Sequence, residues 1–104
     1  MNTKKKTINF NFAKLDNVKV KNMIGNSGRE IPNQFLITTN KGIYFQSYKS
    51  IIAFVPFGDG KTILGTDWAY SNTTSKYRND FLGEEKAETQ SKIKEGVYLV
   101  NPNW

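Results

Sequence analysis

The sequence contains neither cysteine nor histidine. Without cysteine, no disulfide framework and no thiolate metal site can form. Without histidine, the commonest general base and metal ligand is missing, so a hydrolase would need paired carboxylates, a Ser–Lys pair or a metal. Asp67 and Asp80 flank one polar stretch, but at that separation we expect helix caps and surface charges. The residue types therefore favour a protein that is not an enzyme and that uses no cofactor or metal.

Long apolar runs are missing as well. None approaches the ~20 residues that a membrane span needs, and the basic start, Met1–Lys6, is not followed by an apolar segment. A cytoplasmic location without membrane contact is the expectation. Aliphatic residues are sparse, but seven Phe, five Tyr and two Trp are expected to supply much of the packing area. At 104 residues, the chain is expected to form a single domain, 1–104.

Positive charge is concentrated towards the N-terminus. The net charge is +6 in total. Residues 1–30 carry seven Lys or Arg against two acids, whereas residues 67–104 carry five against six. Such asymmetry suggests contact with an anionic partner, which can be nucleic acid, an acidic protein face or a nucleoprotein. The alternative is a solvated lysine-rich surface that keeps a small protein in solution.

The first two thirds of the chain alternate in the manner of strands. Thr7–Phe12 and Val18–Met23 predict a hairpin whose lysines face solvent. Gly25–Asn33 has the strongest loop signal, with two glycines and one proline. Gly58–Thr62 resembles the end of a phosphate-binding loop, but it lacks the first glycine and is interpreted as a hairpin turn. Further strands are predicted at Gln34–Thr39, Ile43–Tyr48, Ser50–Val55 and Lys61–Gly65.

The hydrophobic period changes within Asp67–Gly83. Thr73 or Thr74 is a candidate cap for a helix that presents Tyr77 and Phe81 on one face and ends at Gly83. Glu84–Glu95 predicts a second helix, with early acids and late lysines that suit the helix dipole. Val97–Val100 predicts a strand that rejoins the sheet. The fold class is therefore α+β: an antiparallel curved sheet of five to seven strands, two short helices near the C-terminus and a closing C-terminal strand.

Basic and aromatic side chains are the candidate contact residues. Aromatic rings interleaved with cations can stack on bases or anchor a protein interface. The competing interpretation is that the lysines are solvated and the rings fill the core. For Arg78, a structural ion pair or bonds to exposed strand carbonyls are the alternative. The candidates for partner binding are Lys4, Lys5, Lys6, Lys19, Lys21, Arg29, Tyr48, Tyr70, Lys76, Tyr77 and Arg78.

Three segments carry a family resemblance: Phe45–Ala53, Asp67–Glu84, and Glu88-Thr89-Gln90 followed by Ile93 and Gly96. They resemble a domain of unknown function that recurs in small proteins of bacteriophages, plasmids and integrative elements of low-GC Gram-positive bacteria. The resemblance covers roughly residues 33–100 and implies no activity, cofactor or catalytic residue. On this interpretation, residues 1–32 are a basic β-hairpin appendage to a common core at 33–100.

The resemblance also directs the expectation for function, because small proteins of mobile elements are often inhibitors of host defence. We expect a non-enzymatic inhibitor of a host defence nucleoprotein. Its specific form would be an anti-CRISPR protein that binds a Cas9-type effector with its guide RNA and blocks nucleic-acid binding or cleavage. The alternative is a basic accessory or regulatory protein of a phage or plasmid that binds nucleic acid directly. A homodimer paired through the edge strand Thr7–Phe12 is a third possibility; otherwise the protein is a monomer.

Overall fold

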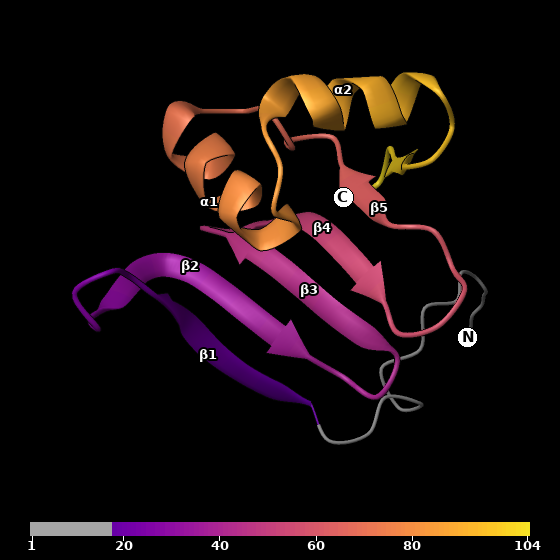
Figure 1. Cartoon of the computed structure of the whole chain (residues 1–104). Helices are drawn as coiled ribbons and strands as arrows, with labels where there is room; N and C mark the ends of the chain where they lie inside the picture. Colours follow the sequence, from indigo (N-terminus) through magenta and orange to yellow (C-terminus); the bar gives the residue numbers. More distant parts are fainter. Residues whose placement is uncertain (1–17) are drawn as a thin grey trace.

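The alternating segments between residues 18 and 65 form consecutive strands, as the sequence predicts. The computed structural model describes residues 18–104, and in them six strands make one open sheet (Figure 1). Neighbouring strands are antiparallel from the first to the fifth, which confirms the α+β class. The elements are β1 (Lys19–Ile24), β2 (Glu30–Thr38), β3 (Gly42–Ser47), β4 (Ser50–Pro56), β5 (Ile63–Gly65), α1 (Asn72–Leu82), α2 (Lys86–Lys94) and β6 (Leu99–Asn101).

Both helices lie over the same face of the sheet (Figure 1). Cross-strand pairing aligns Phe45, Ala53 and Leu64 in one row on that face, and each has an exposed fraction of 0%. The ring of Phe45 lies 5.6 Å from that of Phe81 on α1. Trp68, Phe81, Leu82 and Ile93 pack against the cluster of Ala53, Leu64 and Tyr98. Burial of this apolar surface is the main force that holds the helices on the sheet.

The first strand among residues 18–104 belongs to the main sheet. β1 pairs with β2 from Lys19↔Thr38 to Asn22↔Phe35, so the core sheet includes residues that precede the expected start at residue 33. The expected partner, Thr7–Phe12, lies outside the described residues. The interpretation of residues 18–32 as part of an appendage does not hold for two segments. Residues 19–24 pair with β2, and residues 30–32 belong to β2 itself.

The predicted loop at Gly25–Asn33 is shorter than expected, since β2 already begins at Glu30. The proline within it is tolerated because the β1–β2 register shifts between Asn22 and Ile24. There, the Asn22 side chain donates a hydrogen bond to the carbonyl of Ile31 at 2.9 Å. The prediction of a hairpin turn at Gly58–Thr62 is confirmed, because β4 and β5 pair antiparallel on either side of it.

The first helix starts earlier than its predicted cap. Ser71 is the N-cap, and its Oγ accepts a hydrogen bond from the Thr74 backbone N–H at 3.1 Å. Thr74 is instead buried against the sheet, where its hydroxyl lies 3.0 Å from Ser47 Oγ. The choice of Thr73 or Thr74 as cap is therefore wrong. Gly83 does end the helix, with a left-handed φ of 70° and its N–H bonded to the carbonyl of Asn79.

The closing strand joins the sheet as predicted, but parallel to β5. Parallel neighbours need a long connection across the sheet, and α1 and α2 provide it here. α2 also follows the predicted charge order, with Glu88 in its first turn and Lys92 and Lys94 in its last. The last residue lies beside β5, where the Trp104 carbonyl accepts hydrogen bonds from the backbone and side chain of Thr66.

Candidate functional site

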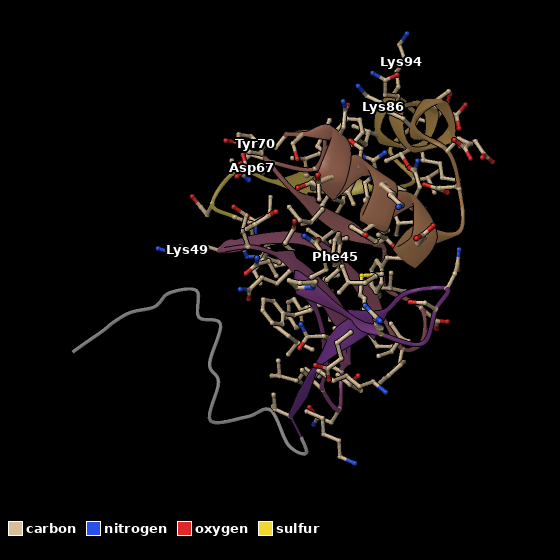
Figure 2. All side chains as sticks on the ribbon, turned by 90° about the vertical axis from the view of Figure 1, so that its left-hand side faces the viewer. Phe45, Lys49, Asp67, Tyr70, Lys86 and Lys94 are labelled. Atoms are coloured by element: carbon tan, nitrogen blue, oxygen red, sulfur yellow. The ribbon has the colours of Figure 1, made fainter. Side chains whose placement is uncertain are left out.

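A cavity of about 770 Å³ lies where the β3–β4 turn meets the loop before α1. Its volume falls in the usual range for ligand pockets, about 300–1,000 Å³. Tyr48 and Lys49 come from the turn, while Asp67 and Tyr70 come from the loop. In Figure 2, Asp67 and Tyr70 lie together at one edge of the molecule with Lys49 beneath them. The remaining lining residues are Asn33, Phe35, Ser47, Ser50, Ile52 and Thr74.

Two tyrosines of this cavity are strongly exposed. The exposed fraction is 77% for Tyr70 and 52% for Tyr48. A ring left in water forgoes the free energy of burial that other aromatic residues of the chain gain in the core. Exposed aromatic side chains beside a hollow are typical of contact surfaces. Two of the predicted contact residues are thus brought together at one site.

The backbone of the cavity contains the only two non-glycine residues with positive φ among residues 18–104, Asn33 at 65° and Tyr48 at 55°. The two are bonded to each other, because the Tyr48 N–H donates to the carbonyl of Asn33 at 2.7 Å. Tyr48 is also held by Gln46, whose Nε2 donates to its carbonyl at 2.6 Å. A left-handed conformation is tolerated by asparagine but costs free energy in a tyrosine. Such conformations occur disproportionately at functional sites.

Asp67 and Ser50 form the polar wall of the cavity. The Ser50 hydroxyl donates a hydrogen bond to Asp67 Oδ2 at 2.9 Å. Among residues 18–104, no partner contacts the other carboxylate oxygen, Oδ1. Asp67 is half-buried, so its carboxylate is held in place by the serine while one oxygen remains able to accept a hydrogen bond from a ligand.

Arg78 does not face outward, contrary to the sequence prediction. Its side chain is fully buried at 0% exposure. Nη1 donates to the carbonyl of Trp68 at 2.5 Å, Nη2 donates to Asn79 Oδ1 at 2.7 Å, and the guanidinium lies 5.1 Å from the Trp68 ring centroid. Burial lowers the pKa of Arg78, and the negative charge of Glu84 opposes that shift. Arg78 therefore binds the chain's own backbone and fixes the loop that carries Asp67 and Tyr70.

The other predicted contact residues are spread over the molecule. Lys76 is exposed on α1, with Nζ 5.3 Å from the ring centroid of half-buried Tyr77. Lys19 and Lys21 are exposed on β1, and Arg29 is exposed in the β1–β2 turn. Lys4, Lys5 and Lys6 lie outside the described residues.

Of the ten residues that line the cavity, sequence reasoning named only Tyr48 and Tyr70 as candidates, and three of the others are notable. Lys49 follows Tyr48 in a two-residue turn, since Ser47 and Ser50 are paired. This tight turn was the signal that could have identified it. Asp67 was expected to be a cap or surface charge, and its pairing with Ser50 spans 17 positions of sequence. Asn33 was placed in a loop, and nothing in the sequence indicates that it bonds to the turn after β3.

A second polar cluster surrounds Glu84, in the link between the helices. Its carboxylate accepts hydrogen bonds from Lys92 Nζ at 2.6 Å, Thr89 Oγ1 at 2.7 Å and Tyr98 Oη at 3.0 Å. Burial acts to raise the pKa of Glu84, but the bonds from Lys92, Thr89 and Tyr98 outweigh it, so the pKa is lowered. Burial and the same carboxylate raise the pKa of Tyr98. With its three partners supplied by the chain, Glu84 ties α2 and the start of β6 to the end of α1.

Neither a metal centre nor a membrane-spanning helix occurs in the described part of the chain. Among residues 18–104, no group of three or more His, Cys, Asp or Glu side chains is arranged to hold a metal ion. In the same range, no helix is long and apolar enough to cross a membrane.

Comparison with known proteins identifies the family. A model of a family of unknown function, DUF8033, matches residues 18–96. The match covers most of the chain, so the protein belongs to this family. Its first matched residue, Val18, directly precedes β1, so the family match includes β1. Searches of curated proteins and of solved structures found no match.

Proposed function

We propose that this DUF8033 member is a non-enzymatic binding protein, and that it inhibits a defence nucleoprotein in the cytoplasm of a host bacterial cell. The observation that carries the proposal is the pair of exposed tyrosines, Tyr48 and Tyr70, at one cavity beside Lys49. Tyrosine is enriched among the residues that dominate binding energy at interfaces. The two rings can therefore pack against a partner surface, and the lysine can contact an anionic group of that partner.

The charge of the chain supports an anionic partner. The net charge of +6 gives a long-range attraction to nucleic acid and to nucleoprotein channels, which speeds encounter at low ionic strength. Lys19 and Lys21 extend the exposed positive charge along the β1 edge. A Cas9-type effector with its guide RNA is the specific partner, and this choice rests on the resemblance to proteins of mobile elements.

The test is a cleavage assay with a purified Cas9-type effector, its guide RNA and a matched DNA target. Inhibition by the wild-type protein, and its loss in the double variant Tyr48→Ala/Tyr70→Ala, is the expected result. Phe57→Ala is the matched control, because Phe57 is a similarly exposed aromatic residue (57%) at the opposite end of β4. Full cleavage in the presence of excess wild-type protein, together with no capture of other defence complexes in pull-downs, would refute the proposal.

A direct nucleic-acid-binding role is the second candidate. It is favoured by the position of Lys49 next to Tyr48, which places a cation and an exposed ring on the same two-residue turn. In this role, the protein acts as an accessory or regulatory factor of its own phage or plasmid. Gel shifts at several salt concentrations test it. Affinity that falls as salt rises supports direct phosphate contact, and the absence of a shift at micromolar protein speaks against it.

A further inference from the structure

We propose that the cavity at Tyr48 and Tyr70 binds an unpaired nucleobase of single-stranded nucleic acid. The inference rests on the proposed function, since it specifies the ligand of the same site. Its starting point is the backbone of Tyr48. A glycine would adopt a φ of 55° without steric cost, yet this position holds a large ring that is half exposed. The strained backbone directs an aromatic side chain to the cavity, where the fold itself does not require one.

Stacking is the interaction that two exposed tyrosines can offer. Every base has a flat π-face, and base–aromatic stacking is a main source of affinity for single strands. Tyr48 and Tyr70 come from different elements, the β3–β4 turn and the loop before α1, so a base that enters the cavity meets a ring from each side of the junction. Bases in a duplex are already stacked and paired, so the cavity selects an unpaired strand.

Asp67 gives the cavity a preference among bases. Ser50 holds Oδ2, and Oδ1 has no partner among the described residues. A carboxylate only accepts hydrogen bonds, so it suits the exocyclic amino group of cytosine and repels the carbonyl that thymine presents at the same position. Lys49, which also lines the cavity, supplies a cation for the adjoining phosphate. The cavity is therefore expected to bind cytosine more tightly than thymine.

The experiment measures fluorescence anisotropy of labelled dC8 and dT8 with the full chain at one fixed salt concentration. These probes have the same length and charge and differ in the base edge. The expected result is tighter binding of dC8, by roughly fivefold or more. Asp67→Asn should bring this ratio close to one. Tyr48→Gly and Tyr70→Ala should each weaken dC8 binding about tenfold or more.

Two control variants test whether the loss of any exposed lysine, or of any exposed aromatic ring, weakens dC8 binding as much as a change in the cavity. Lys94→Ala removes an exposed lysine from α2, which projects from another part of the molecule than Lys49 (Figure 2), and it should change dC8 affinity much less than Lys49→Ala. Phe57→Ala should leave dC8 affinity unchanged. Circular dichroism of each variant verifies that the fold is retained.

The proposal is overturned if dC8 and dT8 bind equally to the wild type, or if the tyrosine variants bind dC8 as tightly as the wild type does. It is also overturned if an arginine-containing octapeptide binds in a Tyr48-dependent manner while dC8 does not, because the cavity then takes a cationic side chain. These results leave the proposed inhibitor function standing, since that function is judged by the cleavage assay. Conversely, if the cleavage assay and the pull-downs both fail while dC8 binding depends on Tyr48, the proposed base site is retained and the inhibitor function is discarded.

Discussion

Tyr48 combines two features that are both unfavourable for the stability of the folded chain. Its backbone lies in the left-handed region, at φ 55°, and its ring remains half exposed at the cavity. The left-handed conformation costs roughly 1–2 kcal/mol in a residue that carries a Cβ. The strain at this position can be tested by stability measurements.

We predict that Tyr48→Gly unfolds at higher urea concentration than Tyr48→Ala, although both lack the ring. Glycine relieves the steric cost, while its greater freedom in the unfolded chain takes back about 0.5–1 kcal/mol. The free energy of unfolding should thus favour glycine over alanine by up to about 1 kcal/mol. Equal or lower stability of the glycine variant would show that the turn is not strained.

Arg78 illustrates the limit of sequence reasoning at the scale of single residues. Its neighbours Tyr77 and Asn79 are polar or amphipathic, so the local sequence does not distinguish an outward from an inward arginine. The structure buries it because the carbonyl of Trp68, ten positions earlier, needs a donor at that place. Partners this far apart are set by tertiary packing. Tyr48 and Tyr70 were identifiable as candidates, but the cavity that joins them was not.

Replacement of Arg78 should be among the most damaging changes to this chain. Arg78→Ala leaves the Trp68 carbonyl without its donor and opens a cavity under α1, so we expect a loss of about 3 kcal/mol or more in the free energy of unfolding. Urea denaturation measures it, with exposed Lys76→Ala on the same helix as the control. A decrease below about 1 kcal/mol for Arg78→Ala would contradict the role assigned to its hydrogen bonds.

Among the elements, those with strong local signals were predictable. Gly83 ends α1 because glycine adopts the left-handed φ that a helix end requires, and the sequence alone indicated this. The N-cap was misplaced because Ser71, Thr73 and Thr74 all suit that role chemically. Thr74 is excluded only by its contact with Ser47 in the sheet. The pairing of β1 was missed for a similar reason, since alternation marks a strand but does not name its neighbour.

The link between the helices should make the stability of the protein depend on pH. The pKa of Glu84 is lowered in the folded state. Its contribution is therefore present in full above the unfolded pKa of about 4.3 and is lost as the pH falls through the lower folded value. Glu84→Gln should reduce the free energy of unfolding at pH 7 by about 1–2 kcal/mol, because it removes the charge that strengthens these hydrogen bonds. The difference from wild type should shrink below about pH 4.

Urea denaturation at about pH 7 and at about pH 3.5, on either side of the ordinary glutamate pKa, measures this difference. Asp59→Asn is the control, since Asp59 is an exposed carboxylate in the turn between β4 and β5. If the difference in the free energy of unfolding between Glu84→Gln and wild type is the same at both pH values, the charge of Glu84 does not contribute to the stability of the cluster.

At the scale of the whole molecule, the net charge is shared between residues 1–17 and residues 18–104. The family match begins at Val18, and β1, the first strand among residues 18–104, begins at Lys19. Residues 1–17 carry four lysines and one aspartate, which is half of the net charge of the chain. The described residues contain both helices, all six strands and the cavity at Tyr48. We therefore predict that residues 18–104 are sufficient for a stable fold, whereas electrostatic affinity depends on both parts of the chain.

Deletion of residues 1–17 should therefore separate these two properties. We expect a cooperative thermal transition and native circular dichroism to persist, because the core row of Phe45, Ala53 and Leu64 is untouched. Affinity for a single strand should fall, and the slope of log affinity against log salt should become shallower by about 0.7 for each phosphate that the deleted lysines neutralise in the full chain. The preference for dC8 over dT8 should remain, since Asp67 and the two tyrosines are retained. Disappearance of the preference with an intact fold would place base selection in the first 17 residues instead of the cavity.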